Sequence, residues 1–181
     1  MNIIESQLRQ IFAGIVWTHK IQEKQSDIYL NRYNFMEFIR IIISALTTSG
    51  VCAVIFVDQY ILKIITAIIS FLGLGISIYY KSYDLGSLQK KHKKSALELL
   101  ELREEIITVL CDIKMEKYNE ESLIIKRDEI IKKQFEIYKE CLDATPQAVK
   151  MASENLKIRR DNTYSDEEID SFLPILARKN K

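Results

Sequence analysis

Residues 41–57 read IIISALTTSGVCAVIFV, and residues 64–80 read IITAIISFLGLGISIYY. Neither run contains Asp, Glu, Lys, Arg or His. A helix rises 1.5 Å per residue, so each run would span ~26 Å, and residues 38–40 and 60–63 can lengthen them toward the ~30 Å thickness of a bilayer core. The sequence therefore predicts two helices that cross a membrane.

The link between the two runs, Asp58-Gln59-Tyr60, is short enough only for a tight antiparallel turn. Both ends of this hairpin then lie on the same side of the membrane. The loop region carries one Lys, whereas the opposite ends are rich in Lys and Arg, so the positive-inside rule places both termini in the cytoplasm. The chain is thus expected to be a multi-pass protein of the inner (plasma) membrane. The basic residues near those ends are Arg32, Arg40, Lys81, Lys90, Lys91, Lys93 and Lys94.

A buried helical hairpin at the centre of a soluble bundle is the alternative to a membrane hairpin. Helices in soluble cores seldom keep more than about 14 consecutive apolar residues. Two longer runs lie next to each other here, which favours the membrane hairpin.

The fold class that we predict is all-α, with the transmembrane hairpin flanked by an N-terminal helix and a C-terminal cytoplasmic helical bundle or coiled-coil-like region. The N-terminal cytoplasmic segment covers residues 1–37. The hairpin covers residues 38–83, with its helices at about 38–57 and 60–80. The C-terminal cytoplasmic region covers residues 84–181.

The C-terminal region shows the sequence signals of several helices. Apolar residues at three- and four-residue steps predict a long helix over residues 85–113. A second helix is expected after a turn at residues 119–122. Thr145-Pro146 reads as an N-cap followed by proline at the first helical position, and Ser165-Asp166-Glu167-Glu168 reads as a capping box that opens a short last helix.

Composition excludes several function classes. The 181 residues carry a net charge of only +1, which gives no overall attraction to nucleic acid, and we expect no direct nucleic-acid binding. The three cysteines form no CxxC pair, and we find no phosphate-binding glycine loop or nucleophile motif. His19 and Glu23 are spaced like two metal ligands but lack a third, while His92 and Arg103 interrupt the apolar seam of the long helix. We therefore predict no enzyme activity, cofactor or metal.

Polar and small residues fall on one face of each membrane helix. In lipid, such residues let helices approach closely and form hydrogen bonds between them. The favoured interpretation is that this face only packs helices against each other. The alternative is that it lines a narrow pore in an oligomer. The candidate residues are Ser44, Thr47, Thr48 and Cys52 in the first helix and Ser70, Gly73 and Ser77 in the second.

A basic run, Lys90, Lys91, Lys93 and Lys94, follows the hairpin. Its first lysine lies ten residues past Tyr80, or ~15 Å along a straight helix, so its attraction to anionic headgroups is weakened by distance and salt. We interpret the run as a solvated topology signal. Binding of a negatively charged partner is the less favoured alternative.

Residues 17–24, WTHKIQEK, lead into the first helix, and residues 44–50, SALTTSG, open the first span. With these segments the chain resembles the SLATT family, the SMODS- and SLOG-associating two-transmembrane effectors of bacteria and archaea. Residues 162–170, NTYSDEEID, with Leu173-Pro174, are similar to the subtype found beside reverse transcriptases. The candidate membrane-entry motif in this resemblance comprises Trp17, His19, Lys20 and Glu23.

The resemblance implies a defence role. Members of the family are thought to be membrane effectors that a partner activates and that oligomerise into pores, which kill or arrest the infected cell. Expected partners are the lipid bilayer, further copies of the chain, and a sensor, a nucleotide-generating enzyme or a reverse transcriptase of the same system. The alternative is a scaffold, in which the hairpin only anchors a helical module that docks a partner protein.

Overall fold

The computed structural model describes residues 2–57, 59–161, 164–174 and 178. These residues form helices and no strand, which confirms the all-α fold class. Asp58 of the short link and residues 162–163 of the subtype stretch lie outside the described residues. The helices are α1 (Asn2–Phe56), α2 (Tyr60–Ser82), α3 (Leu85–Lys114), α4 (Glu120–Glu140), α5 (Pro146–Lys157) and α6 (Asp166–Phe172).

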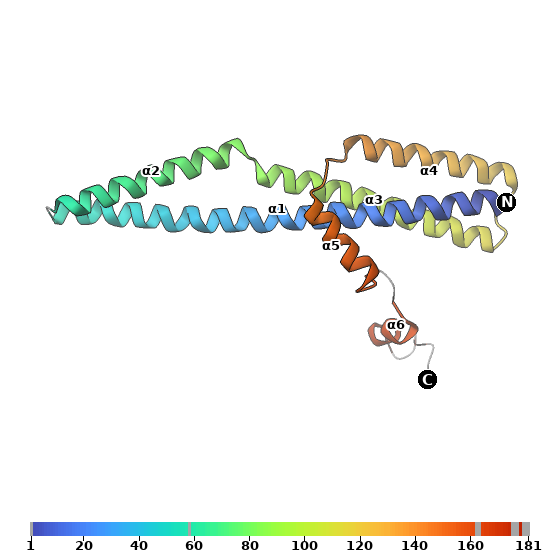
Figure 1. The fold of residues 1–181 in the computed structure, drawn as a ribbon. Helices are drawn as coiled ribbons and strands as arrows, with labels where there is room; N and C mark the ends of the chain where they lie inside the picture. The colour runs from blue at the N-terminus through green and yellow to red at the C-terminus, as the bar shows by residue number, and fades with distance from the viewer. Residues whose placement is uncertain (1, 58, 162–163, 175–177, 179–181) are drawn as a thin grey trace.

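Helix α1 runs without a break through both halves of the molecule (Figure 1). Its 55 residues contain no proline and correspond to ~82 Å of helix. The first half packs along α3, and the second half packs against α2. The boundary expected at residue 37 therefore falls inside one continuous helix.

The chain leaves the hairpin through a two-residue break between α2 and α3. Tyr83 ends α2, and the Asp84 carboxylate then accepts a hydrogen bond from the Ser87 backbone N–H at 2.9 Å, which caps the new helix. Gly86 lies inside α3, where a Cβ would be 3.3 Å from the Tyr33 ring, so it lets α3 approach α1 closely.

A helical bundle fills the other half of the molecule. Helix α3 runs back along α1, and α4 folds over both. Apolar side chains from all three helices are fully buried between them, so burial of this face stabilises the bundle. The core includes Leu8, Ile15, Leu99, Ile106, Leu123 and Ile130.

The remaining helices begin close to the expected signals. Asn119 is the N-cap of α4, so the turn lies at residues 115–119, slightly before the predicted position. The reason is that the Asn119 side chain accepts the Ser122 N–H at 2.8 Å and starts the helix there. Thr145 caps α5, and the capping box of Ser165 and Glu168 opens α6, both as predicted.

Candidate functional site

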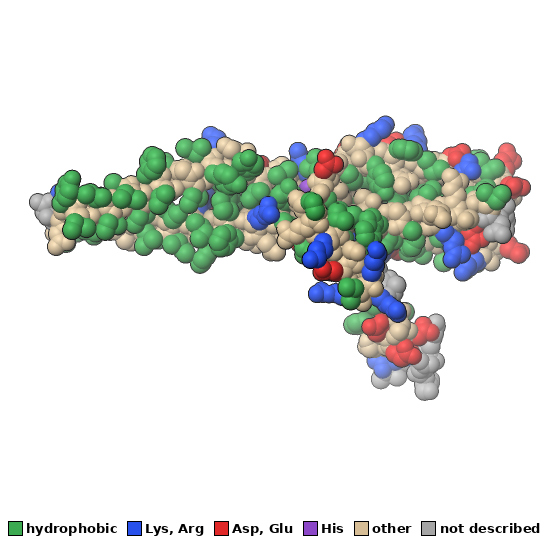
Figure 2. All heavy atoms as spheres, viewed as in Figure 1, with side chains coloured by type: hydrophobic (Ala, Val, Ile, Leu, Met, Phe, Trp, Pro, Cys, Tyr) green, Lys and Arg blue, Asp and Glu red, His purple; other side chains and the backbone are tan. Residues whose placement is uncertain are grey.

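The outer surface of the hairpin is apolar. Both α1 and α2 contain a stretch long and apolar enough to cross a membrane, and none of either stretch is buried within the protein. Figure 2 shows hydrophobic side chains covering this half of the molecule, with charged side chains gathered over the bundle. Phe71, for example, is 76% exposed. Exposure of so much apolar surface is unfavourable in water and suits lipid, which argues against a hairpin buried in a soluble bundle.

Two glycines set the close packing of the hairpin helices. A Cβ on Gly50 would meet Thr66 Oγ1 at 2.7 Å, and a Cβ on Gly73 would meet Ile43 Cγ2 at 2.9 Å. Larger side chains at either position would push α1 and α2 apart. These contacts use small residues at a helix interface, as is common in lipid.

Beside this contact, the polar faces of α1 and α2 meet in one open groove of about 990 Å³. The groove brings together all but one of the candidate face residues. Cys52 is exposed outside the lining, which reaches only to Ser49 because Gly50 packs against Thr66 just beyond it. The lining residues from the predicted face are Ser44, Thr47, Thr48, Ser70, Gly73 and Ser77, and the small residues Ala45 and Ser49 lie beside them.

Four of the hydroxyl groups in the groove donate to carbonyl oxygens of their own helices. Thr48 Oγ1 donates to the Ser44 carbonyl oxygen at 2.9 Å, and Ser70 Oγ donates to that of Thr66 at 2.8 Å. Ser49 and Ser77 do the same to the carbonyls four residues earlier. Each of these four donors is thus satisfied without water, while its oxygen keeps lone pairs that can accept hydrogen bonds from water.

An arginine stands at the end of the groove nearest the bundle. Arg40 is part of the lining, and its Nη2 lies 2.7 Å from Glu37 Oε2. The guanidinium carbon is 5.8 Å from the centre of the Tyr80 ring. Our sequence prediction placed no charge in this face. The signal was present, because Arg40 lies four and seven residues before Ser44 and Thr47 and so shares their helical face.

The candidate membrane-entry residues lie in the bundle. Glu23 is ~27 Å along α1 from the start of the uncharged run at Ile41. The Lys157 ammonium of α5 lies 5.5 Å from the centre of the Trp17 ring. The Lys20 ammonium lies 3.0 Å from the Glu23 carboxylate and 3.4 Å from that of Asp161. The structure therefore places these residues where α5 crosses α1, at a distance from the hairpin.

A layer of buried polar side chains joins α1, α3 and the segment between α4 and α5. His92 Nδ1 lies 2.5 Å from Gln22 Oε1, and Gln22 Nε2 donates to the Leu142 carbonyl at 3.0 Å. The amide NH₂ of Gln22 is thus turned to Leu142, so its oxygen accepts from a neutral His92 that carries its proton on Nδ1. Gln25 Oε1 accepts from both the backbone N–H and the hydroxyl of Thr145 at 2.8 Å. These bonds fix the position of α5 relative to α1.

Burial lowers the pKa of both histidines in this layer. For His92, desolvation is the cause. For His19, desolvation again has the largest effect, Glu23 opposes it, and nearby cations add to the lowering of the pKa. Those cations are Arg103, Lys20 and Lys93.

We expect the bundle to lose stability as pH falls through about 6.5, the ordinary pKa of histidine in the unfolded chain. Below that pH the unfolded state binds more protons at His19 and His92 than the folded state, so protonation favours unfolding. The melting temperature of the purified protein should be lower at about pH 5.5 than at about pH 7.5. Each kcal/mol lost corresponds to roughly 2–4 °C.

A His19→Gln/His92→Gln variant is the control for this pH effect. It should show a flatter dependence over the same range, because carboxylates titrate mainly below it. An equally steep dependence in the variant would assign the effect to other groups.

The basic run lies on the first turns of α3, beside the hairpin. Its lysines are exposed. Lys94 contacts Glu140 at 3.0 Å and Glu98 at 3.5 Å, which ties α3 to the end of α4. Exposed pairs of this kind contribute little to stability.

The chain matches one family model over residues 4–168, which covers most of its length. That model describes family 4 of the SMODS and SLOG-associating 2TM effector domains. No curated protein and no solved structure matches the chain. Two membrane-competent helices joined in a hairpin, followed by a helical bundle, agree with the two transmembrane segments in that description. The match extends over both the hairpin and the bundle, and the chain belongs to the SMODS and SLOG-associating two-transmembrane effector family.

Proposed function

We propose that the protein is a membrane effector that oligomerises and opens a pore on activation. The observation that carries this proposal is the groove, in which hydroxyl-bearing faces of α1 and α2 converge within an otherwise apolar hairpin. Two helices cannot enclose a water-filled channel, so several hairpins must place their grooves around a shared axis. Helix α1 carries both the groove and the bundle, so a partner that displaces the bundle also displaces the groove.

The setting that we propose is a prokaryotic defence system, in which the pore kills or arrests an infected cell. The hairpin would lie in the inner membrane with both termini in the cytoplasm, because the basic residues flank that end of the hairpin. A sensor, a nucleotide-generating enzyme or a reverse transcriptase of the same system would supply the signal to the bundle. We expect neither catalysis nor direct nucleic-acid binding.

A membrane-anchored scaffold is the second candidate. The observation that favours it is that four of the groove hydroxyls already donate within their own helices, so this part of the groove is also stable against lipid or another helix. In that case the hairpin would only tether the bundle, and the bundle would dock a partner.

Leakage from liposomes tests the pore. The full-length protein is reconstituted at increasing protein-to-lipid ratio, and release of potassium and of a small dye is followed. A pore built from several copies should give leakage that rises more steeply than the protein content. Intact liposomes with protease-verified insertion would favour the scaffold. In cells, replacing residues 38–83 with an unrelated two-helix anchor should abolish growth arrest by a pore and preserve the activity of a scaffold.

We expect Arg40→Gln to shift the ion preference of the pore toward cations. The substitution leaves the paired Glu37 carboxylate uncompensated at the mouth of the groove. One unit charge acting at ~4 Å in water changes the energy of an ion by about 1 kcal/mol, or about fivefold in permeability ratio. The reversal potential across a bilayer with a KCl gradient measures this shift. Arg32→Gln, an exposed arginine of α1 outside the groove, should leave the reversal potential unchanged.

A further inference from the structure

A group of lysines marks the point where α2 ends and α3 begins. Lys81 lies in the last turn of α2, and Lys90, Lys91 and Lys93 follow near the beginning of α3. All four side chains are exposed, and none of them pairs with an acidic side chain in the part of the chain that the structure describes. We call these four lysines the basic elbow. Their neighbour Lys94 is left out, because acidic side chains of α3 and α4 already contact it.

Nearby acidic side chains do not cancel the charge of the basic elbow. Asp84 is the one acidic residue in the sequence between residues 81 and 94, so the four lysines and Asp84 together carry a charge of +3. The facing stretch of α1, residues 26–40, contacts residues 80–89 through Ser26, Tyr33 and Arg40. Its own charges sum to zero, and they belong to Asp27, Arg32, Glu37 and Arg40. This level of the molecule is therefore positive overall.

The lysines of α3 do not stabilise their own helix through its dipole. The dipole favours anions near the beginning of a helix and cations near its end. Helix α3 has the opposite arrangement, because its lysines come first and are followed by four glutamates and one arginine between residues 98 and 105. This order suits an anionic surface that lies beyond the beginning of α3, on the side of the hairpin.

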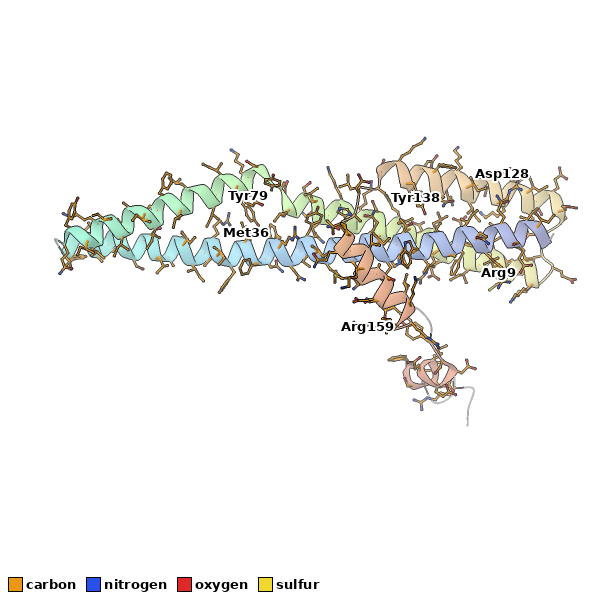
Figure 3. The ribbon with its side chains drawn as sticks, viewed as in Figure 1. Arg9, Met36, Tyr79, Asp128, Tyr138 and Arg159 are labelled. Atoms are coloured by element: carbon orange, nitrogen blue, oxygen red, sulfur yellow. The ribbon has the colours of Figure 1, made fainter. Side chains whose placement is uncertain are left out.

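The hairpin indicates where the membrane surface lies relative to the basic elbow. Exposed aromatic side chains gather where the uncharged runs end, with Phe35 at 62%, Tyr79 at 53% and Tyr83 at 56%. Figure 3 shows Tyr79 of α2 and Met36 of α1 at about the same distance along the molecule, next to the break between α2 and α3. Tyrosines at the ends of membrane helices sit at the level of the lipid headgroups. Lys81 shares that level.

The lysines of α3 are within electrostatic reach of the same layer. Lys90 and Lys91 follow Tyr83 by seven and eight residues, which corresponds to ~10–12 Å at the rise of a helix. Helix α3 begins at the hairpin and runs away from it (Figure 1). Because Cα–Cβ bonds tilt toward the beginning of a helix, these lysine side chains extend back toward the membrane. The gap that remains is comparable to the Debye length of ~8 Å at physiological salt.

We propose that the basic elbow binds the headgroups of anionic phospholipids in the leaflet on the bundle side of the hairpin. The ammonium groups would donate hydrogen bonds to lipid phosphates or lie close enough to attract them. The elbow adjoins the lipid-facing surface of the hairpin, where headgroups are concentrated, so a membrane lipid is the anion that it meets. This contact would hold the beginning of α3 at the membrane. It requires an inserted hairpin and does not depend on whether the groove conducts ions.

Spin-labelled lipids test this contact. The full-length protein is reconstituted in phosphatidylcholine liposomes that contain a trace of spin-labelled phosphatidylglycerol or spin-labelled phosphatidylcholine. Electron paramagnetic resonance then measures the fraction of label that the protein immobilises. The association constant should be about twofold or more higher for phosphatidylglycerol, since each lysine near the surface attracts anionic lipid. Salt at about 1 M, where the Debye length is ~3 Å, should reduce this preference.

The variant Lys90→Gln/Lys91→Gln should reduce the preference for phosphatidylglycerol, while Lys81 remains to support insertion. The matched control is Lys114→Gln/Lys132→Gln, which removes the same charge from two exposed lysines of the bundle and should keep the preference. Three outcomes would overturn the proposal: equal association of both lipids with the unmodified protein, an unchanged preference in Lys90→Gln/Lys91→Gln, or an equal loss in the control.

Single substitutions separate a membrane lipid from an anion that approaches through water. Lys90→Gln should reduce the preference more than Lys93→Gln, because Lys93 lies three residues farther along α3 and attraction to the membrane decreases with distance. The reverse order would contradict a contact with headgroups. None of these measurements follows ion flux, so the lipid contact can fail while the pore stands, and the pore can fail while the lipid contact stands.

Discussion

Replacing Thr47 and Thr48 together with leucine should reduce ion flux through the protein by about tenfold or more. Both residues line the groove in the described hairpin, Thr47 beside α2 and Thr48 on the open side. Leucine removes the hydroxyl oxygens that can accept hydrogen bonds from water and adds apolar volume. A narrow apolar constriction excludes water, and ions do not cross a dry segment. Insertion should be unaffected, because the uncharged run becomes more hydrophobic.

The matched control is Val51→Leu/Cys52→Leu, which adds apolar volume to the same helix outside the groove. Potassium release from liposomes with equal amounts of inserted protein compares the two variants. Flux should be lost in the threonine variant and kept in the control. Unchanged flux in the threonine variant would remove this face from the conduction path, and equal losses in both would indicate a general effect on the hairpin.

Much of the hairpin could be predicted from the sequence, because two uncharged runs with a short link allow few other structures. The two polar faces could be predicted too, since residues 44, 47 and 48 share one face of a helix and residues 70, 73 and 77 share another, whereas their meeting in one groove is seen only in the structure. Periodicity shows which residues share a face and does not show where that face stops. Cys52 was assigned to the polar face of the first helix by this periodicity, and in the structure the contact of Gly50 with Thr66 ends the groove lining before it.

The contacts of the bundle were less predictable. His92 reads as an interruption of an apolar seam, yet the structure gives it a buried partner, Gln22, seventy residues earlier. A polar side chain on an apolar face can be buried only where a partner from another helix meets it, and the sequence does not reveal that partner. The N-cap at Asp84 was also missed, although aspartate is a preferred N-cap residue.

Leu99→Ala should destabilise the bundle by about 2–5 kcal/mol, the range for removing a buried leucine from a close-packed core. Leu99 is fully buried among side chains of α1, α3 and α4. Alanine would leave a cavity that these long helices cannot close without moving along their whole contact. The melting temperature of the full-length protein in detergent should fall by roughly 4–20 °C.

Leu97→Ala is the control, since Leu97 lies two residues away on the same helix and is 53% exposed. The Leu97→Ala substitution should change the free energy of unfolding by no more than about 0.5 kcal/mol, as at most surface positions. Equal losses at the two positions would mean that the face of α3 turned to α1 is not the buried one. A large loss at Leu97 alone would place a partner on the outer face of α3. A large loss for Leu99→Ala and a small one for Leu97→Ala would show that the packing of α1 against α3 holds the bundle together. Because α1 also lines the groove, a displacement of the bundle would then move the groove as well.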